Sequence, residues 1–285
     1  MGLGVALSGG GLKCISHIGS LKALEDLKVK IDYVSGASSG SMIAALYVLG
    51  YTTEEMMKLI KENYAAVTRI SRKPIFKLIA ALMIKTELDE EGLIPGEKIE
   101  ELVDKYAADK GVKNISDIKI PFALATVDTI STKECIIMSK DIGLKNDNID
   151  YITNMPIGKA VRASMSFSGI LTTCNFEKYN FIDGATKNNL PTEILQSMGA
   201  DKILGINFKL GTYNPSKNIF EVLLRTIDIF SMEDVKRRQK IADLAIEVDT
   251  FETSLLNTGD IDKCYNAGYD TIMEKREEIL KLLQN

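Results

Sequence analysis

Histidine is almost absent from this chain of 285 residues, in which His17 stands alone. The chain has only four cysteines, which lie far apart and form no Cys-x-x-Cys pair, so it lacks the nitrogen and sulfur ligands of a zinc site. We therefore expect no metal ion and no other cofactor. We expect free thiols, as in a reducing compartment, at all four cysteines: Cys14, Cys135, Cys174 and Cys264.

The chain also lacks long apolar runs and blocks of like charge. No stretch reaches the roughly 18–20 apolar residues of a membrane-spanning helix, and the start MGLGVAL has neither the basic region nor the cleavage site of a signal peptide. With 35 basic and 39 acidic residues the net charge is −4, which argues against a nucleic-acid-binding face. We predict a cytoplasmic protein that contacts membranes only peripherally and binds no nucleic acid.

Strand-like and helix-like stretches alternate along the sequence. Strands are expected at 3–8, 33–35, 122–127, 134–138, 179–182 and 202–208. Helices are expected at 12–27, after 40, from Thr53, and at 155–163 and 261–283, and a long helical stretch is expected within 216–246. Such alternation predicts an α/β fold, a three-layer α/β/α sandwich with a mainly parallel central sheet. Since no linker or repeat interrupts it, we expect one domain over 1–285, with a motif-bearing core in 3–210 and a C-terminal helical portion in 211–285.

Gly36-Ala37-Ser38-Ser39-Gly40 fits the pattern Gly-x-Ser-x-Gly between an expected strand and an expected helix. A serine at such a turn is held in a tight conformation that exposes its hydroxyl at the end of the sheet, and small neighbours permit the sharp turn. The following helix directs its free N–H groups and its positive dipole end at the same point. The pattern also occurs in turns without chemistry, but this context makes Ser38 the candidate nucleophile.

A serine hydroxyl needs a base, and the only histidine is not where a triad places it. In α/β hydrolases the histidine follows the nucleophile and the acid, whereas His17 precedes Ser38. We expect His17 to be a structural residue near the glycine loop, and a buried carboxylate with a raised pKa to be the base. Asp183 is the best candidate, because it ends an apolar strand and precedes Gly184 and Ala185; a simple turn-forming aspartate is the alternative.

Gly9-Gly10-Gly11 follows the first expected strand and opens a helix. Without side chains, these residues can present successive backbone N–H groups at close range, as the oxyanion of an acyl-transfer reaction requires. A nucleotide-binding loop is the alternative. Against it, Cys14 stands at the third glycine of Gly-x-Gly-x-x-Gly, and no Gly-Lys-Ser/Thr is present.

Taken in order, these segments resemble the patatin-like phospholipase family. The likeness spans 3–210 and consists of Gly9-Gly10-Gly11-Leu12-Lys13, Gly36-Ala37-Ser38-Ser39-Gly40, Asp183-Gly184-Ala185 and Asn189-Leu190-Pro191. It implies a lipid acyl hydrolase, a phospholipase A or lysophospholipase, with Ser38 as nucleophile, Asp183 as base and an acyl-serine intermediate. It also implies that the N–H groups of Gly10 and Gly11, with Gly9 as a third, bind the oxyanion. Lys13 then helps to hold an anionic headgroup or the loop itself.

Two departures from the family pattern stand near these motifs. Cys14 replaces the glycine that follows the basic residue, and the segment 163–170 lacks a proline. Neither changes Ser38 or Asp183. Two other functions stay open: an acyltransferase or thioesterase with the same dyad, or a non-catalytic phosphate- or nucleotide-binding protein that uses the glycine loop.

Two further segments are candidates for contact with a phospholipid or other acyl-lipid substrate. The apolar stretch Ile75–Ile84 lies between basic residues and predicts a peripheral membrane contact, with a core helix as the alternative. Lys236-Arg237-Arg238 predicts a solvated helix face, with headgroup contact as the alternative.

Overall fold

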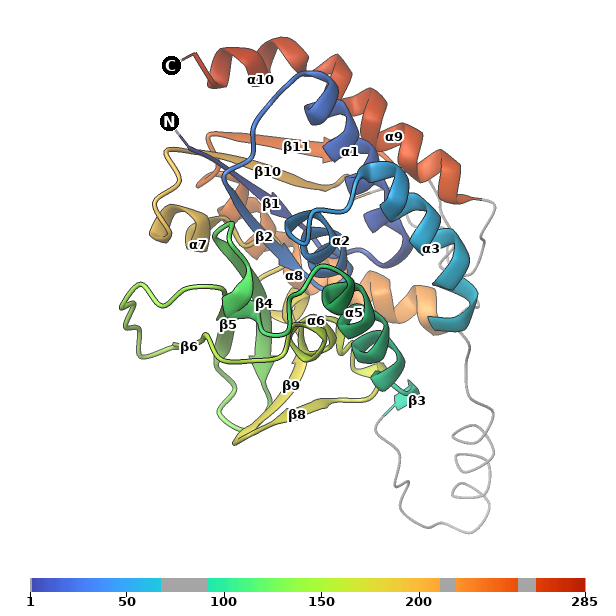
Figure 1. Cartoon of the computed structure of the whole chain (residues 1–285), viewed down its shortest axis with the longest axis vertical. Helices are drawn as coiled ribbons and strands as arrows, with labels where there is room; N and C mark the ends of the chain where they lie inside the picture. The colour runs from blue at the N-terminus through green and yellow to red at the C-terminus, as the bar shows by residue number, and fades with distance from the viewer. Residues whose placement is uncertain (1, 68–91, 211–218, 251–259, 285) are drawn as a thin grey trace.

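The computed structural model describes residues 2–67, 92–210, 219–250 and 260–284. Within these ranges a nine-stranded sheet has the order β11-β10-β1-β2-β4-β5-β6, and β8 and β9 extend it beside β4 (Figure 1). Its strands are β1 (Leu3–Leu7), β2 (Tyr33–Ala37), β4 (Phe122–Asp128), β5 (Glu134–Met138), β6 (Ile149–Ile152), β8 (Cys174–Phe176), β9 (Tyr179–Asp183), β10 (Lys202–Phe208) and β11 (Leu244–Val248). A separate pair is formed by β3 (Gly92–Ile94) and β7 (Gly169–Leu171).

The sheet is mainly parallel, as the sequence predicted. From β11 to β4 all neighbouring strands are parallel, whereas β4 and β5 form an antiparallel hairpin. Every residue of β1 and β4 is buried, as is typical of central strands with helices on both faces.

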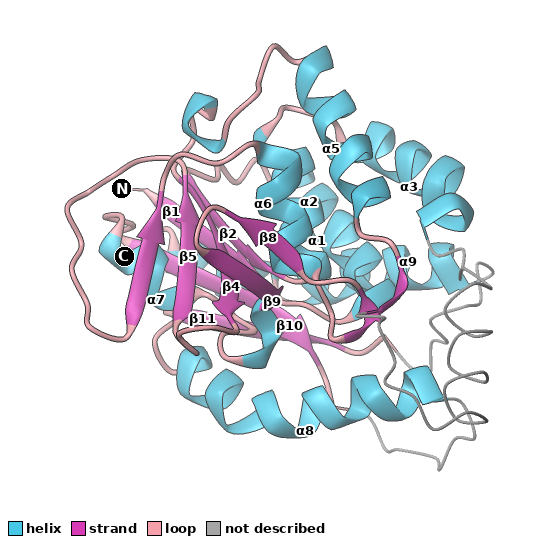
Figure 2. Cartoon of the chain, turned by 90° about the horizontal axis from the view of Figure 1, so that it is seen from below, coloured by secondary structure: helices cyan, strands magenta, loops and turns pink. Residues whose placement is uncertain are grey.

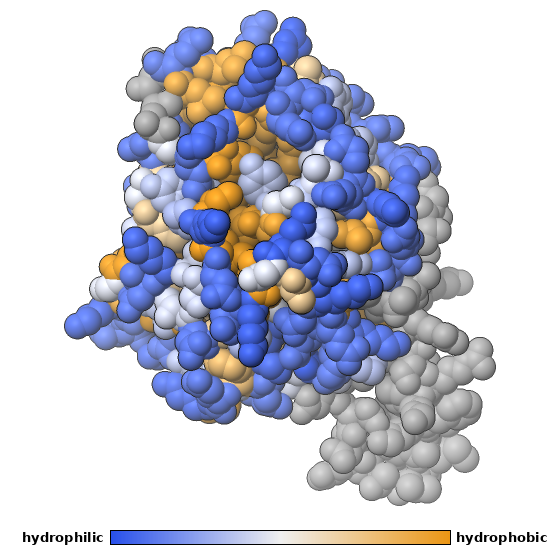
Figure 3. Space-filling model, in the orientation of Figure 1, coloured by the Kyte–Doolittle hydropathy of each residue, from blue (hydrophilic) through white to orange (hydrophobic). Residues whose placement is uncertain are grey.

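Helices cover both faces of the sheet and make the three-layer arrangement that the sequence predicted (Figures 1 and 2). On one side lie α7 (Thr192–Ser197) and α8 (Ile219–Gln239), and on the other α1 (Ile15–Asp26), α2 (Ser39–Val48), α5 (Glu97–Asp109), α6 (Ile157–Met165) and α9 (Ile261–Glu274). The remaining helices of the described residues are α3 (Thr53–Val67), α10 (Arg276–Leu282) and three short 3-10 helices, η1 (Gly11–Cys14), η2 (Ile115–Asp117) and η3 (Gly184–Thr186). Figure 3 shows apolar surface near α10 on the face opposite α8.

The C-terminal helix α9 packs closely along α1 through two glycines. A Cβ atom on Gly268 would lie 1.8 Å from the carbonyl oxygen of Ser16, and one on Gly19 would lie 1.9 Å from that of Tyr265. Only glycine allows the two backbones to approach this closely. The contact joins the C-terminal residues to the first strand–helix unit of the chain.

One expected helix is wrong in part, and another is shorter than the stretch that contains it. The stretch 261–283 divides into α9 and α10, because Lys275 leaves helical geometry (φ −91°, ψ 8°) and α10 then turns Ile279 into the core. The long helical stretch expected within 216–246 is α8, which ends at Gln239, because Leu244–Val248 pairs in parallel with β10 as an edge strand. None of the described helices is long and apolar enough to cross a bilayer. The segment 75–84 lies outside the described residues.

Candidate active site

Ser38 and Asp183 are 145 residues apart in sequence, and they meet because two strands end head to head beside β4. β2 pairs in parallel with the first half of β4, where Ala37 lies opposite Ala125. β9 pairs antiparallel with the second half, where Asp183 lies opposite Thr126. Since β5 occupies the other side of β4, β9 continues the line of β2 in the opposite direction. The carboxyl ends of β2 and β9 are thereby brought together.

Ser38 forms the sharp turn between β2 and α2. Its φ of 51° and ψ of −132° are unusual for a residue with a side chain and cost roughly 1–3 kcal/mol. The surroundings hold this conformation: the Ser38 N–H donates to Ser164 Oγ at 3.1 Å, and the Ser41 N–H donates to the Ser38 carbonyl at 2.9 Å. A Cβ atom on Gly40 would lie 2.5 Å from the carbonyl of Leu7, so the turn fits against β1 only with glycine there.

The Ser38 hydroxyl donates a hydrogen bond to Oδ2 of Asp183 at 2.6 Å. Oδ1 of Asp183 accepts the Ala185 N–H at 2.8 Å. Burial raises the pKa of Asp183 to about 7, although both hydrogen bonds favour the ionised form. A carboxyl group with this pKa can accept and return a proton near neutral pH, which is the property that a base in place of histidine needs.

The turn after Asp183 is fixed against β4 and α6. The Asp183 N–H donates to the carbonyl of Ser166 at 2.9 Å. A Cβ atom on Gly184 would lie 2.1 Å from the carbonyl oxygen of Ala125, which explains the glycine after the aspartate. Ser164 donates to that same carbonyl at 2.7 Å while it accepts the Ser38 N–H. Ser164 therefore links the serine turn to the strand beside it.

The glycine loop lies directly against the serine turn. A Cβ atom on Gly9 would stand 2.5 Å from the Cβ of Ser38. The Gly9 N–H donates to Oδ1 of Asn189 at 2.9 Å, and the Gly10 N–H donates to Oγ of Ser39 at 3.1 Å. Gly11, with φ 60°, begins η1.

The side chains after the glycines do not form a second reactive centre. Lys13 is half-buried on η1, and the buried thiol of Cys14 has its pKa raised by burial to about 12, which keeps it protonated. His17 is buried, with Nε2 2.8 Å from the carbonyl oxygen of Ser8 and its ring 4.8 Å from that of Phe208. Burial lowers the pKa of His17 to about 4, so it is neutral at pH 7 and supports the residue before the glycine loop.

Sequence reasoning missed the partners that hold these groups. Asn189 stood out only as part of Asn-Leu-Pro, and its bond to the Gly9 N–H joins segments 180 residues apart. Ser164 lies in a serine-rich stretch that gives no reason to choose one serine over another. Ser39 was noted only as a position in the Gly-x-Ser-x-Gly pattern. These roles depend on tertiary contacts that no local pattern encodes.

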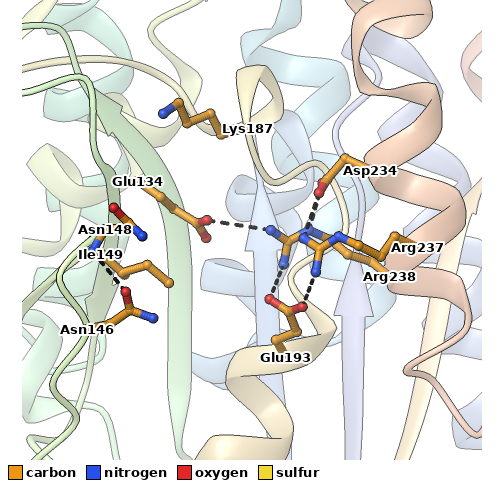
Figure 4. Close-up of a pocket in the computed structure, with 9 residues that line it drawn as sticks. All are labelled: Glu134, Asn146, Asn148, Ile149, Lys187, Glu193, Asp234, Arg237 and Arg238. Atoms are coloured by element: carbon orange, nitrogen blue, oxygen red, sulfur yellow. Dashed lines mark hydrogen bonds and ion pairs between the residues drawn. The ribbon is translucent and has the colours of Figure 1, made fainter.

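A polar pocket of about 290 Å³ lies between β5, α7 and α8 (Figure 4). Arg238 reaches into it with only 2% of its side chain exposed, and contacts Asp234 at 2.7 Å, Glu193 at 3.0 Å and Glu134 at 3.5 Å. The expectation of a solvated 236–238 cluster is therefore wrong for Arg238, because these carboxylates draw it inward, whereas Lys236 and Arg237 are exposed. The described residues contain no cluster of three or more potential metal ligands.

The four cysteines are free, as the sequence predicted, and all are buried. The fold and the site together define an α/β protein with a serine–aspartate pair at a strand–turn–helix junction. A family model described as Patatin-like phospholipase matches residues 5–195, and the chain belongs to this family. The resemblance seen in the sequence motifs is thereby confirmed.

Similar proteins come from animals, fungi and bacteria. Patatin-like phospholipase domain-containing protein 6 of Mus musculus is 26% identical over 298 residues, which cover 94% of this chain and 20% of the mouse protein. Lysophospholipase NTE1 of Yarrowia lipolytica is 25% identical over 205 residues, covering 72% of this chain and 12% of the fungal protein. The chain thus spans a fifth or less of the length of these two relatives. The crystal structure of VipD from Legionella pneumophila shares the fold, with a TM-score of 0.56, 14% identity and coverage of 96% of this chain and 66% of VipD.

Proposed function

We propose that this chain is a lipid acyl hydrolase, of the phospholipase A or lysophospholipase type, that acts through Ser38 and Asp183. The observation that carries the proposal is the hydrogen bond of 2.6 Å between the Ser38 hydroxyl and a buried carboxyl group whose pKa is about 7. Family membership and the name of the fungal relative support a lipid ester as the substrate.

In the proposed reaction, Ser38 Oγ attacks the ester carbonyl carbon while its proton passes to Asp183 Oδ2. The tetrahedral intermediate collapses, the bond to the alcohol oxygen breaks, and Asp183 returns the proton to that oxygen. Water then attacks the acyl-serine and gives a proton to Asp183. When the serine ester bond breaks, Asp183 returns the proton to Ser38 and the fatty acid leaves. The first and the last of these four proton transfers take place across the 2.6 Å contact between Ser38 and Asp183, and the other two pass between Asp183 and the alcohol oxygen or the water.

The glycine loop supplies the proposed oxyanion donors. Because the Gly9 N–H is already bonded to Asn189, we assign it to fixing the loop and leave Gly10 and Gly11 as the donors. The Gly10 N–H exchanges its 3.1 Å bond to Ser39 for the oxyanion when substrate is present. Lys13, which follows these residues on η1, is the proposed contact for an anionic headgroup. The bond between the Gly9 N–H and Asn189 inside the protein also disfavours the nucleotide-binding interpretation of this loop.

The test compares wild type with Ser38→Ala and Asp183→Asn on a lysophosphatidylcholine and on a soluble p-nitrophenyl ester. Both substitutions are expected to lower kcat/KM by at least about a thousandfold with unchanged circular dichroism. Asp128→Asn is the matched control, because Asp128 is also buried at a strand end but bonds to Ser131 and Asn180. Equal loss in the control, or activity in Ser38→Ala, contradicts the proposal. Product analysis with added alcohol or thiol acceptors separates hydrolysis from acyl transfer.

A further inference from the structure

Large apolar side chains project into solvent from one face of α8. Val222, Ile229 and Phe230 are 42%, 55% and 76% exposed. With about 3.6 residues per turn, these three positions fall on one side of the helix. Ser231 and Arg238, two turns apart, fall on the opposite side and are buried. We call the exposed side, defined by Val222, Ile229 and Phe230, the outer face of α8.

The inner side of α8 is firmly attached to the rest of the molecule. Arg238 pairs with Asp234 on its own helix, with Glu193 on α7 and with Glu134 at the start of β5 (Figure 4). Breaking a buried ion pair of this kind is strongly destabilising, because it leaves an uncompensated charge. Turning the outer face inward would break the contacts with Glu193 and Glu134. The apolar side chains of α8 are thus held at the surface by the fold itself.

The inner side of α8, opposite the outer face, contacts the neighbourhood of the proposed active site. α8 packs against η3, the turn that directly follows Asp183. Two further exposed apolar residues, Ile130 and Leu210, follow the ends of β4 and β10, which are parallel to β2 and its terminal Ser38. Among the described residues, the other large apolar side chain that is exposed is Leu280, which lies apart from these on α10.

Positive charge follows the apolar residues along the helix. Lys236 is exposed and lies on the same side as Ile229, and Lys240 is exposed in the turn that follows the helix. Arg237 is exposed beside Lys236 and pairs with Glu193 and Asp234. Apolar side chains that enter the boundary between headgroups and acyl chains, next to cations that meet lipid phosphates, are the features of a helix lying on a bilayer. A single exposed acidic residue, Glu233, stands among these residues in the described part of this face.

We propose that the outer face of α8 seats the protein on a lipid surface that contains anionic lipids. The proposal rests on the proposed function for its biological meaning, since the ester substrate lies in such a surface, but binding itself requires no hydrolysis. In this arrangement α8 lies between the lipid surface and η3, the turn that follows Asp183. Phe230, the most exposed of the three side chains, is expected to contribute most.

The experiment measures sedimentation with vesicles of phosphatidylcholine, with and without phosphatidylglycerol, using Ser38→Ala protein so that hydrolysis plays no part. The double variant Ile229→Gln, Phe230→Gln is expected to weaken binding at least about tenfold. Leu280→Gln, which removes an exposed apolar side chain on α10, is the matched control and leaves binding unchanged. Lys236→Gln with Lys240→Gln is expected to weaken binding only to vesicles with phosphatidylglycerol.

Four results overturn the proposal. Three of them are no binding by the parent protein, unchanged binding by the double variant, and an equal loss of binding with Leu280→Gln. The fourth is a difference in molecular mass between the parent and the double variant in light scattering, which would assign the outer face to a second copy of the chain. With Ser38 restored, the double variant is expected to keep full turnover of the soluble ester. If the parent itself does not turn that ester over, the proposed function fails, while the vesicle result still decides the role of α8.

Discussion

The pH dependence of activity follows from the environment of Asp183. Burial raises the pKa of this carboxyl group from an ordinary 3.8 to about 7, and only its ionised form can take the proton of Ser38. Below that pKa the ionised fraction falls tenfold for each pH unit. It is roughly one tenth at pH 6 and roughly one hundredth at pH 5. We therefore expect kcat/KM to be level in mild alkali and to fall on this slope in acid.

The assay is the hydrolysis of a soluble p-nitrophenyl ester between about pH 5 and pH 9, because kcat/KM reports the pKa of the free enzyme. His17→Gln is the control variant, since the native His17 is neutral over this range with a pKa of about 4. If this variant keeps its fold, its kcat/KM should fall in acid with the same midpoint pH as that of wild type. Full activity at pH 5, which an ordinary aspartate would give, refutes the reasoning, and so does a midpoint that moves in His17→Gln.

Three further substitutions test the site and its frame. Asp183→Asn should raise the free energy of unfolding relative to wild type by up to roughly 4 kcal/mol at pH 8, measured by urea denaturation. The reason is that wild-type stability falls as pH rises from 3.8 to about 7, whereas asparagine does not ionise. Asn189→Ala should lower kcat about tenfold in steady-state assays, since the Gly9 N–H loses its acceptor. Gly268→Ala should lower the free energy of unfolding by several kcal/mol, about 3 or more, whereas the exposed Asn266→Ala should have little effect.

Each of these has a clear contrary result. Equal stability of wild type and Asp183→Asn at pH 8 would show that the buried carboxyl is not costly to ionise. Unchanged kcat in Asn189→Ala would remove the assigned role of this side chain in fixing the glycine loop. If Gly268→Ala has the same free energy of unfolding as wild type, the C-terminal helices do not unfold together with the core, contrary to the expected single domain.

The serine turn could be predicted from the sequence because it is local. A strand, a small-residue turn and a helix occur within a few residues, so the pattern alone indicates that Ser38 projects from the end of a strand. The partner was chosen by elimination, since His17 is the only histidine and precedes the serine. That Asp183 lies within hydrogen-bonding distance could not be read directly. It depends on β9 continuing the line of β2 beside β4, a long-range pairing without a local signal.

The C-terminal portion shows a different limit. The charged sequence Lys236-Arg237-Arg238 is typical of a solvated face, yet Arg238 is buried because Glu134 and Glu193 come from β5 and α7 to meet it. Leu244–Val248 was not predicted as a strand, and it is one because β10 offers a free edge. In both cases the outcome is set by residues distant in sequence, which composition and periodicity do not identify.

The central claim is that Ser38 is a nucleophile activated by Asp183, and covalent labelling tests it most directly. A fluorophosphonate probe is incubated with wild type, Asp183→Asn and Ser38→Ala, and the modified peptide is identified by mass spectrometry. We predict one label on Ser38 in wild type, labelling slowed at least about a hundredfold in Asp183→Asn, and none in Ser38→Ala. Labelling at another residue, or equal rates in wild type and Asp183→Asn, would contradict the serine–aspartate pair.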